Sequence, residues 1–378
     1  MKIIIYTQVY PDNEGFLGGI FIHNQAMALK RAGHDICVAY LDLRSLRKKR
    51  KLIKCKYQLD SICVYRLALP ISPFKKIINC FSESLTNNLL NWAIRENGLP
   101  DVFYAHFGDY AYSIIKFSKK VSIPYVVIEH ASSILTRNIG MRQFERITRA
   151  YNEASKIISV SNALKNEISK ITYKDITVIP NILPNYFFSE NTVFKKNDTD
   201  FTFVSVGNLI KRKSFDITIS AFAKVCTQNS SIKLYIVGKG EEENSLKQLV
   251  SKLNLCDKVF FLGQIDNQIL PKTLMECNCF VLPSKFETFG VVYIEAMSCG
   301  IPVIATKCGG PEEFINEMNG LLIDVDNVDE LVDAMIYMID NCEKYDSKLI
   351  KEYAYNISSE ETVTKKIEKV LYEAIIHE

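Results

Sequence analysis

The chain has 378 residues, 48% of them hydrophobic and 24% charged, and its net charge is +3. This composition is typical of a soluble globular protein of two domains of about 150 to 200 residues, and no apolar run approaches the roughly 18 residues that would cross a bilayer. The eleven cysteines are scattered without a C-x-x-C pair, which argues against a disulfide scaffold or a zinc site and predicts reduced thiols in the cytoplasm.

In the first half of the chain, short apolar runs alternate with segments of helical length. The runs expected to form strands are KIIIYT (residues 2–7), DICVAY (35–40), DVFYAH (101–106), PYVVIEH (124–130), KIISVS (156–161) and ITVIP (176–180). A helix is expected over residues 20–32, after the first run. Strands that alternate with helices in this way predict a parallel α/β sheet.

A basic stretch lies between the second and the third of these runs. Residues 44–56, RSLRKKRKLIKCK, contain eight cations and no anion, and residues 1–190 carry +11 against −8 for residues 191–378. The stretch is interpreted either as a solvated loop or helix face or as a contact with an anionic membrane, where each basic residue adds about 1 kcal/mol. Nucleic acid is not expected as a partner, because aromatic residues are not interleaved with the basic ones.

The alternation stops at residues 189–200, SENTVFKKNDTD, a polar segment expected to be a linker. It resumes with expected strands at FTFVSVG (201–207), KLYIVG (233–238), KVFFLG (258–263), CFVLP (279–283) and PVIAT (302–306). We therefore predict two Rossmann-like, doubly wound parallel-sheet domains, residues 1–188 and 201–358, and a final amphipathic helix over 359–378. Ligands of such sheets bind at the carboxyl ends of the strands, so a site is expected in a cleft between the domains.

A phosphate site is expected where one of these strands leads into a helix. The motifs G-x-x-x-x-G-K-[ST] and G-x-G-x-x-G after the first strand are absent, so the helix VVYIEAMSC, which Gly290 opens, is the candidate anion site. Glu287 precedes this helix and Glu295 lies about one turn inside it. Carboxylates accept hydrogen bonds from sugar hydroxyls, so the pair suits a diphosphate with a sugar on each side, as in a nucleotide-sugar.

Three cations follow the first strand of the second domain, in the sequence GNLIKRKS. Lys211, Arg212 and Lys213 are expected at the carboxyl end of that strand, where they can reach the same phosphates. The D-x-D sequence Asp324-Val-Asp326 is interpreted as turn and helix-cap chemistry. No essential metal or other cofactor is expected.

The chain resembles the retaining GT-B glycosyltransferases of family 4 over nearly its whole length. Their E-x7-E motif is matched by Glu287-TFGVVYI-Glu295, followed by EAMSCGIPVIATKCGGPEEFI. Further resemblances, in the family's order, are LGGI (17–20), VVIEHAS (126–132), VIPNI (178–182) and VSVGNLIKRK (204–213). The resemblance implies a GT-B fold and the transfer, with retained anomeric configuration, of a hexosyl group from UDP-hexose or GDP-mannose in the synthesis of bacterial surface polysaccharide or glycolipid.

The resemblance also implies roles for matching residues. His130 and Glu287 would meet the transferred sugar, Lys213 would bind the diphosphate, and Glu295 would hold the ribose hydroxyls. The other expected donor-binding positions are Gly18, Gly19, Asn208, Arg212, Gly263, Phe289, Gly290 and Val291. The C-terminal helix would pack back on the first domain.

One position departs from the family. An arginine usually follows the glycine of VGxL, and this chain has Asn208 there. Asparagine is neutral and cannot make the bidentate contact of an arginine. Either Lys211 or Arg212 supplies the missing charge, or the chain is a catalytically inactive GT-B partner subunit.

The acceptor is expected to bind the first domain. His106 and Asp109 end one of its strands and are candidates for lining the acceptor side. The surplus of basic residues favours a saccharide acceptor linked to polyprenyl diphosphate, at the cytoplasmic face of an anionic membrane. The donor base and sugar stay open, because the base would meet mainly backbone near Gly263.

Overall fold

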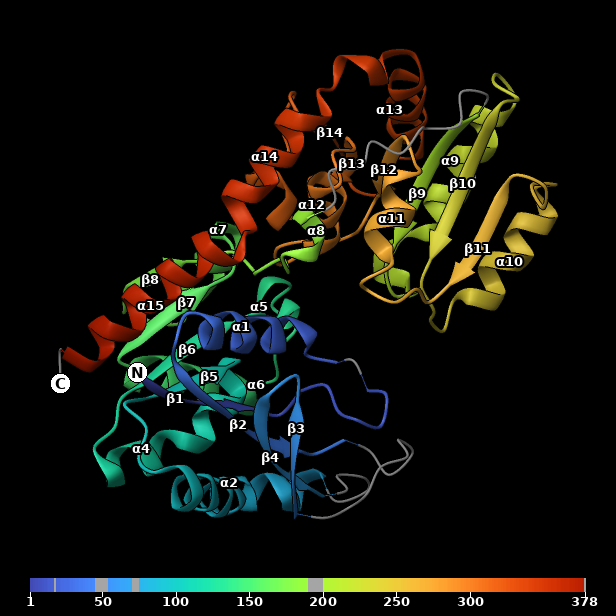
Figure 1. Ribbon diagram of the computed structural model, residues 1–378. Helices are drawn as coiled ribbons and strands as arrows, with labels where there is room; N and C mark the ends of the chain where they lie inside the picture. The colour runs from blue at the N-terminus through green and yellow to red at the C-terminus, as the bar shows by residue number, and fades with distance from the viewer. Residues whose placement is uncertain (17, 45–53, 70–74, 190–199, 377–378) are drawn as a thin grey trace. The chain divides into compact units, whose positions relative to one another are not determined.

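The computed structural model describes the chain except for residues 17, 45–53, 70–74, 190–199 and 377–378 (Figure 1). The chain forms two compact units, residues 1–182 with 360–378 and residues 183–359. Each unit is built around one sheet that is parallel or almost wholly parallel, which confirms the predicted α/β class.

The first unit contains an eight-stranded sheet in the order β3-β4-β2-β1-β5-β6-β7-β8. Its strands are β1 (Lys2–Thr7), β2 (Asp35–Asp42), β3 (Lys54–Leu59), β4 (Ile62–Ala68), β5 (Val102–His106), β6 (Tyr125–Glu129), β7 (Lys156–Ser159) and β8 (Ile176–Val178). The residues of β5 and β6 are all buried, as expected for central parallel strands covered by helices on both faces.

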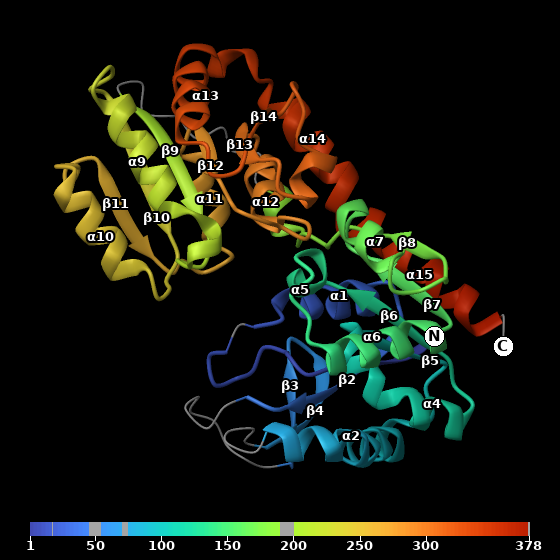
Figure 2. The same ribbon diagram turned by 180° about the vertical axis from the view of Figure 1, so that it is seen from behind.

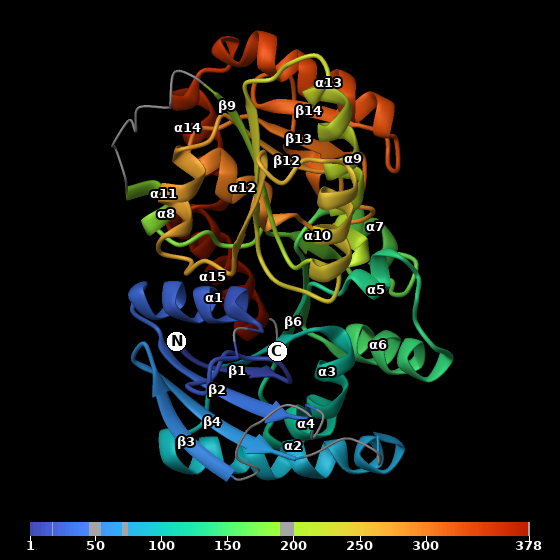
Figure 3. The ribbon, with the colours of Figure 1, turned by 90° about the vertical axis from the view of Figure 1, so that its right-hand side faces the viewer.

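Helices cover both faces of this sheet. In Figures 1 and 3, α1 (Ile20–Arg31) lies on one face and α2 (Lys75–Asn97) on the other, and α15 (Glu360–Ile376) packs beside α1. The others are α3 (Gly108–Ala111), η1 (Tyr112–Ile114), α4 (Ile115–Val121), α5 (Ser132–Leu135), α6 (Met141–Glu153) and α7 (Asn162–Ile168). Helix α15 is tied to the unit by Arg31–Glu360 (2.6 Å), His34–Glu368 (2.7 Å) and Lys156–Glu373 (3.0 Å).

The hairpin β3–β4 differs from the sequence prediction of parallel strands alone. β3 runs antiparallel to β4 at the edge of the sheet, and Asp60 and Ser61 make the turn with φ angles of 45° and 68°. Lys54 and Lys56, from the basic stretch, therefore lie in an edge strand rather than in a loop or helix. Lys54 Nζ lies 4.3 Å from the ring centroid of Trp92, and Lys56 pairs with Glu96 at 2.6 Å.

The second unit contains a six-stranded parallel sheet in the order β11-β10-β9-β12-β13-β14. Its strands are β9 (Phe201–Val206), β10 (Ile232–Val237), β11 (Val259–Gly263), β12 (Cys279–Leu282), β13 (Val303–Thr306) and β14 (Gly320–Ile323). Figure 2 shows β9, β10 and β11 side by side. The order of the strands brings the carboxyl ends of β9 and β12 together.

Helices cover this sheet on both sides too, with α9, α10 and α13 on one side and α11, α12 and α14 on the other (Figure 3). Their bounds are α8 (Tyr186–Ser189), α9 (Phe215–Cys226), α10 (Glu243–Lys252), α11 (Leu270–Met275), α12 (Val291–Ser298), α13 (Val328–Asn341) and α14 (Ser347–Ser358), with 3-10 turns η2 (Lys211–Lys213), η3 (Gly310–Glu313) and η4 (Cys342–Lys344). Residues 183–188, predicted to end the first domain, group with the second unit because Leu183 bridges to Ser359 and α8 packs on α12.

Candidate active site

One polar cluster lies at the carboxyl ends of β9 and β12. Lys213 ends the turn η2 after β9, and Glu287 follows β12. The backbone of Glu287 is fixed by a bridge to the next loop, because its N–H donates to the Cys308 carbonyl and its own carbonyl accepts from Gly310 N–H, both at 2.9 Å. This bridge fixes the position from which the Glu287 side chain extends.

Glu287 is paired with two cations. Its Oε1 accepts a hydrogen bond from Lys213 Nζ, and its Oε2 lies 3.2 Å from Arg212 Nη1. The same Arg212 nitrogen donates to the Phe286 carbonyl at 3.1 Å. Burial alone would raise the pKa of Glu287, but the charges of Lys213 and Arg212 outweigh burial and hold this pKa below its ordinary value. Glu287 is therefore an ionised carboxylate.

Glu295 lies on α12 in a different environment. Its side chain is half-buried, and no residue in the described chain forms a hydrogen bond or ion pair with its carboxyl group. Burial raises the pKa of Glu295 to about 7, with Lys213 opposing the shift. The two glutamates that the sequence presents as a matched pair thus differ, one ionised and one that titrates near neutral pH.

Two glycines let the backbone close around the start of α12. Gly290 caps the helix with φ 90°, and a Cβ there would lie 2.7 Å from a ring carbon of Tyr293. A Cβ on Gly310 would lie 2.5 Å from the Cα of Phe289. The Phe289 side chain is buried, so this residue offers a ligand only its backbone, and Val291 is half-buried in the first helical turn. The Tyr293 N–H donates to the Gly290 carbonyl at 3.1 Å. The N–H groups of Val291 and Val292, at the start of the helix, have no acceptor within the helix.

Of the other predicted cations and donor-binding residues of this unit, only some contact Glu287. Arg212 joins Lys213 on Glu287, whereas Lys211 is exposed and lines another hollow, of about 210 Å³, with Asp216 and Glu242. Asn208 is exposed, and within the described chain its side chain has no hydrogen-bond partner. Gly263 ends β11 with φ 70°, and its carbonyl accepts from Gly238 N–H at 2.7 Å.

The aspartates of the D-x-D sequence pair with lysines. Asp324 lies 2.7 Å from Lys307 and Asp326 2.8 Å from Lys285. The cap of α13 is Asn327, not an aspartate. Over the residues that the structure describes, no group of three or more His, Cys, Asp and Glu side chains is placed to hold a metal ion.

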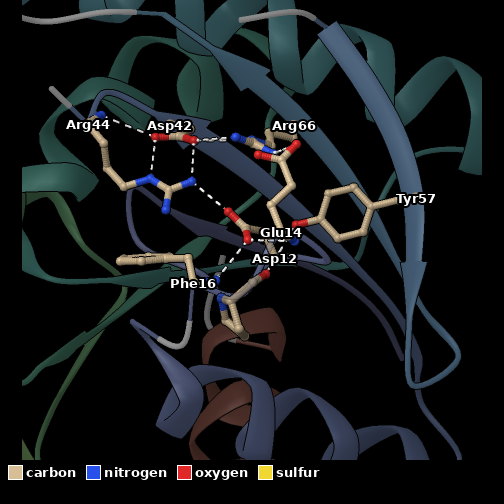
Figure 4. A network of polar contacts seen from close by, with 8 residues as sticks. Asp12, Glu14, Phe16, Asp42, Arg44, Tyr57 and Arg66 are labelled. Atoms are coloured by element: carbon tan, nitrogen blue, oxygen red, sulfur yellow. Dashed lines mark hydrogen bonds and ion pairs between the residues drawn. The ribbon is translucent and has the colours of Figure 1, made fainter. Parts of the chain in front are cut away.

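In the first unit, the predicted glycine loop opens α1. Gly19 caps the helix with φ 82°, and a Cβ there would lie 2.7 Å from the Val9 carbonyl oxygen. A Cβ on Gly18 would meet the ring of Phe16 at 2.2 Å. Phe16 is held in turn by Asp12, whose Oδ1 accepts the Phe16 N–H at 3.0 Å (Figure 4). The backbone of residues 12–16 is thus held by the Asp12 carboxylate.

A buried ionic network anchors Asp12. Arg44 donates to Asp12 Oδ2 at 2.6 Å and to both oxygens of Asp42 at 2.8 and 2.9 Å, and its guanidinium lies 3.9 Å from the Phe16 ring centroid (Figure 4). Asp42 also accepts from the buried Arg66 at 2.8 Å. Arg44, the first cation of the basic stretch, is thus turned to buried carboxylates. Residues 45–53 lie outside the described residues, so membrane contact by this stretch stays a prediction.

His130 follows β6 beside the end of β5. Its Nε2 lies 3.3 Å from Nδ1 of His106, which is fully buried, and burial lowers the pKa of His130 to about 3. Of the two expected acceptor-side residues, His106 therefore packs beneath His130. Asp109 forms an ion pair with Arg146 at 3.1 Å.

The sequence indicated no role for Glu129, which binds the backbone at the ends of β5 and β6. Its buried carboxylate accepts the N–H groups of Gly108, His130 and Ala131, each at 2.8 Å, and the Tyr151 hydroxyl at 2.6 Å. Burial raises the pKa of Glu129, while Tyr151 and the three N–H groups lower it in part. The signal for it in the sequence was its place at the end of an apolar run, next to His130.

Comparisons with known proteins cover both units. Residues 18–183 match the family model described as Glycosyltransferase Family 4, and residues 188–356 match that of Glycosyl transferases group 1. N-acetyl-alpha-D-glucosaminyl L-malate synthase from Bacillus anthracis is 27% identical over 310 residues, which cover 78% of this chain and 80% of that protein.

Two solved structures illustrate the shared fold. Sucrose-phosphate synthase from Thermosynechococcus elongatus has a TM-score of 0.81 at 18% identity, over 100% of both chains. HepE from Anabaena, in complex with UDP, has a TM-score of 0.77 at 21% identity, over 98% of this chain and 100% of that one. Within the described residues, no helix has both the length and the apolar character needed to cross a membrane.

Proposed function

Since the chain belongs to the GT-B glycosyltransferases, we propose that it is a retaining enzyme that moves a hexosyl group from a nucleotide-sugar to a saccharide or lipid-linked acceptor. The observation that carries the proposal is the convergence of Lys213 and Arg212 on Glu287, beside the start of α12. Two cations and a helix N-terminus suit a leaving diphosphate, and carboxylates suit sugar hydroxyls.

The proposed chemistry needs stabilisation of a leaving anion. The bond between the anomeric carbon and the diphosphate oxygen breaks, and its electron pair goes to the diphosphate. An acceptor hydroxyl oxygen forms the new bond to the anomeric carbon, and its proton goes to the departing diphosphate. Lys213, Arg212 and the first N–H groups of α12 would stabilise this charge, and each such group is worth about 10² to 10³ in rate. We propose that no metal is required, because cationic side chains are already placed for this task.

Arg212 is proposed to replace the arginine that the family usually has at the position of Asn208. Its guanidinium is fixed by Glu287 and the Phe286 carbonyl, on the same carboxylate as Lys213. Lys211, the other substitute that the sequence left open, lines a separate hollow. This placement weighs against the alternative of an inactive partner subunit.

The remaining assignments follow the resemblance. Glu287 would meet the transferred hexose, Glu295 the ribose, and His130 the reacting part of the sugar. The UDP in the HepE complex favours a uridine donor, with GDP-mannose as the alternative. We propose a cytoplasmic protein whose basic stretch contacts an anionic membrane that carries a polyprenyl-diphosphate-linked acceptor.

Calorimetric titration of the full chain, without metal, with UDP, GDP, ADP, dTDP and their sugars tests the donor site. We expect one nucleotide to bind selectively, with at least tenfold weaker binding in Lys213→Ala and Glu295→Ala. Lys211→Ala is the matched control and is expected to bind like the unaltered chain. Binding of no nucleotide would support the inactive subunit, and equal binding by all three variants would refute the site.

The proposed retention of the anomeric configuration is tested separately, on the reaction product. With the identified donor and a saccharide acceptor, proton NMR of the new glycosidic linkage is expected to show the anomeric configuration of the donor. The opposite configuration would refute the retaining mechanism while leaving the donor site intact.

A further inference from the structure

Two histidines of the first unit lie ring beside ring at the carboxyl ends of adjacent strands. His106 ends β5 and His130 follows β6, and the planes of the rings differ by only 3° with centroids 5.4 Å apart. His106 Nδ1 and His130 Nε2 are 3.3 Å apart, so one of these nitrogens carries the hydrogen that the other accepts. Which one donates decides what His130 can offer to a ligand.

Both rings are neutral near pH 7. Burial holds the pKa of His106 well below its ordinary value, with the neighbouring His130 adding to the effect. Burial alone lowers the pKa of His130 to about 3. A neutral imidazole has one N–H and one bare nitrogen, so fixing the proton of one ring fixes the tautomer of the other.

The buried side of His106 determines the direction of the hydrogen bond. Its Nε2 is inaccessible to solvent and has no hydrogen-bond partner among the described residues. A proton on this Nε2 would be a buried N–H without an acceptor, which is rarer in proteins than an unfilled acceptor. A proton on His106 Nδ1 leaves only a lone pair unfilled and donates to His130 Nε2. The second arrangement is the less costly one.

We propose that His106 is a positioning residue that holds His130 in the Nδ1–H tautomer, so that His130 offers a hydrogen-bond donor, not an acceptor, to an oxygen of the bound sugar. The donation to His130 Nε2 leaves the proton of His130 on its other nitrogen. Within the described chain no residue forms a hydrogen bond with His130 Nδ1, and the ring is half-buried where His106 is fully buried. The identity of the oxygen rests on the proposed function; the tautomer does not.

The surroundings keep the His130 ring in this orientation. Phe21 and Phe107 lie against it with ring centroids 4.5 and 5.4 Å away. Glu129 holds the N–H groups on either side of the Cα of His130, and Phe107 is kept at a φ of 70°, which is unusual for a non-glycine residue. A ring confined in this way offers its N–H in one direction.

Nitrogen-15 NMR of the full chain, labelled only at its five histidines, tests the tautomer directly. We expect the His130 signals to show a protonated Nδ1 and a bare Nε2, unchanged between about pH 6 and 8 because the ring stays neutral. The assignment comes from the loss of these signals in His130→Ala. A protonated Nε2 on His130 in the unaltered chain overturns the proposal, whatever the enzyme is found to transfer.

Two variants of His106 separate positioning from packing. The amide nitrogen of an asparagine can take the place of His106 Nδ1 and donate to His130, whereas a leucine cannot donate. We expect His106→Asn to keep the Nδ1–H form and kcat/KM within about threefold, and His106→Leu to lose the fixed tautomer and about tenfold or more in kcat/KM. If His106→Leu keeps the Nδ1–H form and full activity, His106 only fills space. If the unaltered chain transfers no sugar, the proposed function fails while the tautomer is still decided by the spectra.

Discussion

The two units carry contrasting polar clusters at the ends of their central strands. In the second unit, the buried carboxylate of Glu287 is balanced by the charges of Lys213 and Arg212. In the first unit, the buried carboxylate of Glu129 is balanced by backbone N–H groups and a tyrosine hydroxyl, beside two neutral histidines. Burial of a carboxylate can thus be offset by ions or by dipoles.

The contrast fits the proposed division of work between the units. A leaving diphosphate gains charge in the reaction, so cations are useful beside it. A sugar hydroxyl stays neutral, so neutral donors with fixed directions are useful beside it.

The largest effect is expected from Lys213→Met, which removes one counter-charge and leaves Glu287 buried with Arg212 alone. Breaking a buried ion pair costs about 3 to 5 kcal/mol in the free energy of unfolding, and loss of a phosphate-binding cation costs about 10² to 10³ in kcat. Urea unfolding and steady-state kinetics measure the two losses. Lys211→Met, at an exposed position two residues away, is expected to change stability by less than about 0.5 kcal/mol. Equal losses of stability and kcat in the two variants would show that Lys213 neither balances the charge of Glu287 nor binds the diphosphate.

The dipolar cluster is tested by Glu129→Gln. A glutamine has one acceptor oxygen where Glu129 uses two, so at least one buried N–H loses its acceptor, at about 1 to 3 kcal/mol. Tyr151→Phe is the matched variant, because it removes one donor and keeps all three N–H contacts of Glu129. We expect it to cost about 1 kcal/mol in urea unfolding. A larger loss in Tyr151→Phe than in Glu129→Gln would mean that the tyrosine, not the carboxylate, holds the strand ends.

The sequence predicted most of the polar cluster in the second unit, because the residues that indicate it lie close together in the sequence. Gly290 marks the start of α12, and Glu287 and Glu295 are placed by counting from it. The apolar runs likewise predicted the central strands of both sheets. The edge hairpin β3–β4 was missed, since the cations of its first strand were interpreted as loop or helix surface, although lysines are common on edge strands.

The features that the sequence did not predict depend on contacts between residues that are far apart in the chain. The network of Asp12, Asp42, Arg44 and Arg66 joins three segments, and no spacing in the sequence brings them together. The direction of Arg212 also depends on a carbonyl and a carboxylate from another loop. Without a structure, Lys211 and Arg212 were equal candidates, because adjacent residues differ only in which way the backbone turns them.

The role of Arg212 is tested by moving its positive charge to position 208 of the same unit. Arg212→Ala is expected to lower kcat about tenfold or more, because one cation near the diphosphate is lost. Adding Asn208→Arg to this variant restores an arginine at the usual position of the family, and we expect it to recover most of the loss. Steady-state kinetics with the identified donor measures both. Failure of the double variant to recover, with an unchanged melting temperature, would mean that Arg212 acts through Glu287 rather than on the donor.

The smallest effect is expected from Glu295→Gln, and its sign depends on pH. The pKa of Glu295 is raised from 4.5 to about 7 in the folded chain, so the folded state binds this proton more tightly than the unfolded state. Stability from this group is therefore present below about pH 4.5 and is lost as pH rises towards 7, by about 1 to 2 kcal/mol after allowance for solvent screening. Glutamine does not titrate, so the stability of Glu295→Gln relative to the unaltered chain should rise over that interval in urea unfolding. Exposed Glu241, changed to Gln, is the control. A constant difference between pH 5 and 8 would place the Glu295 carboxyl in water and make it equivalent to an ordinary surface glutamate.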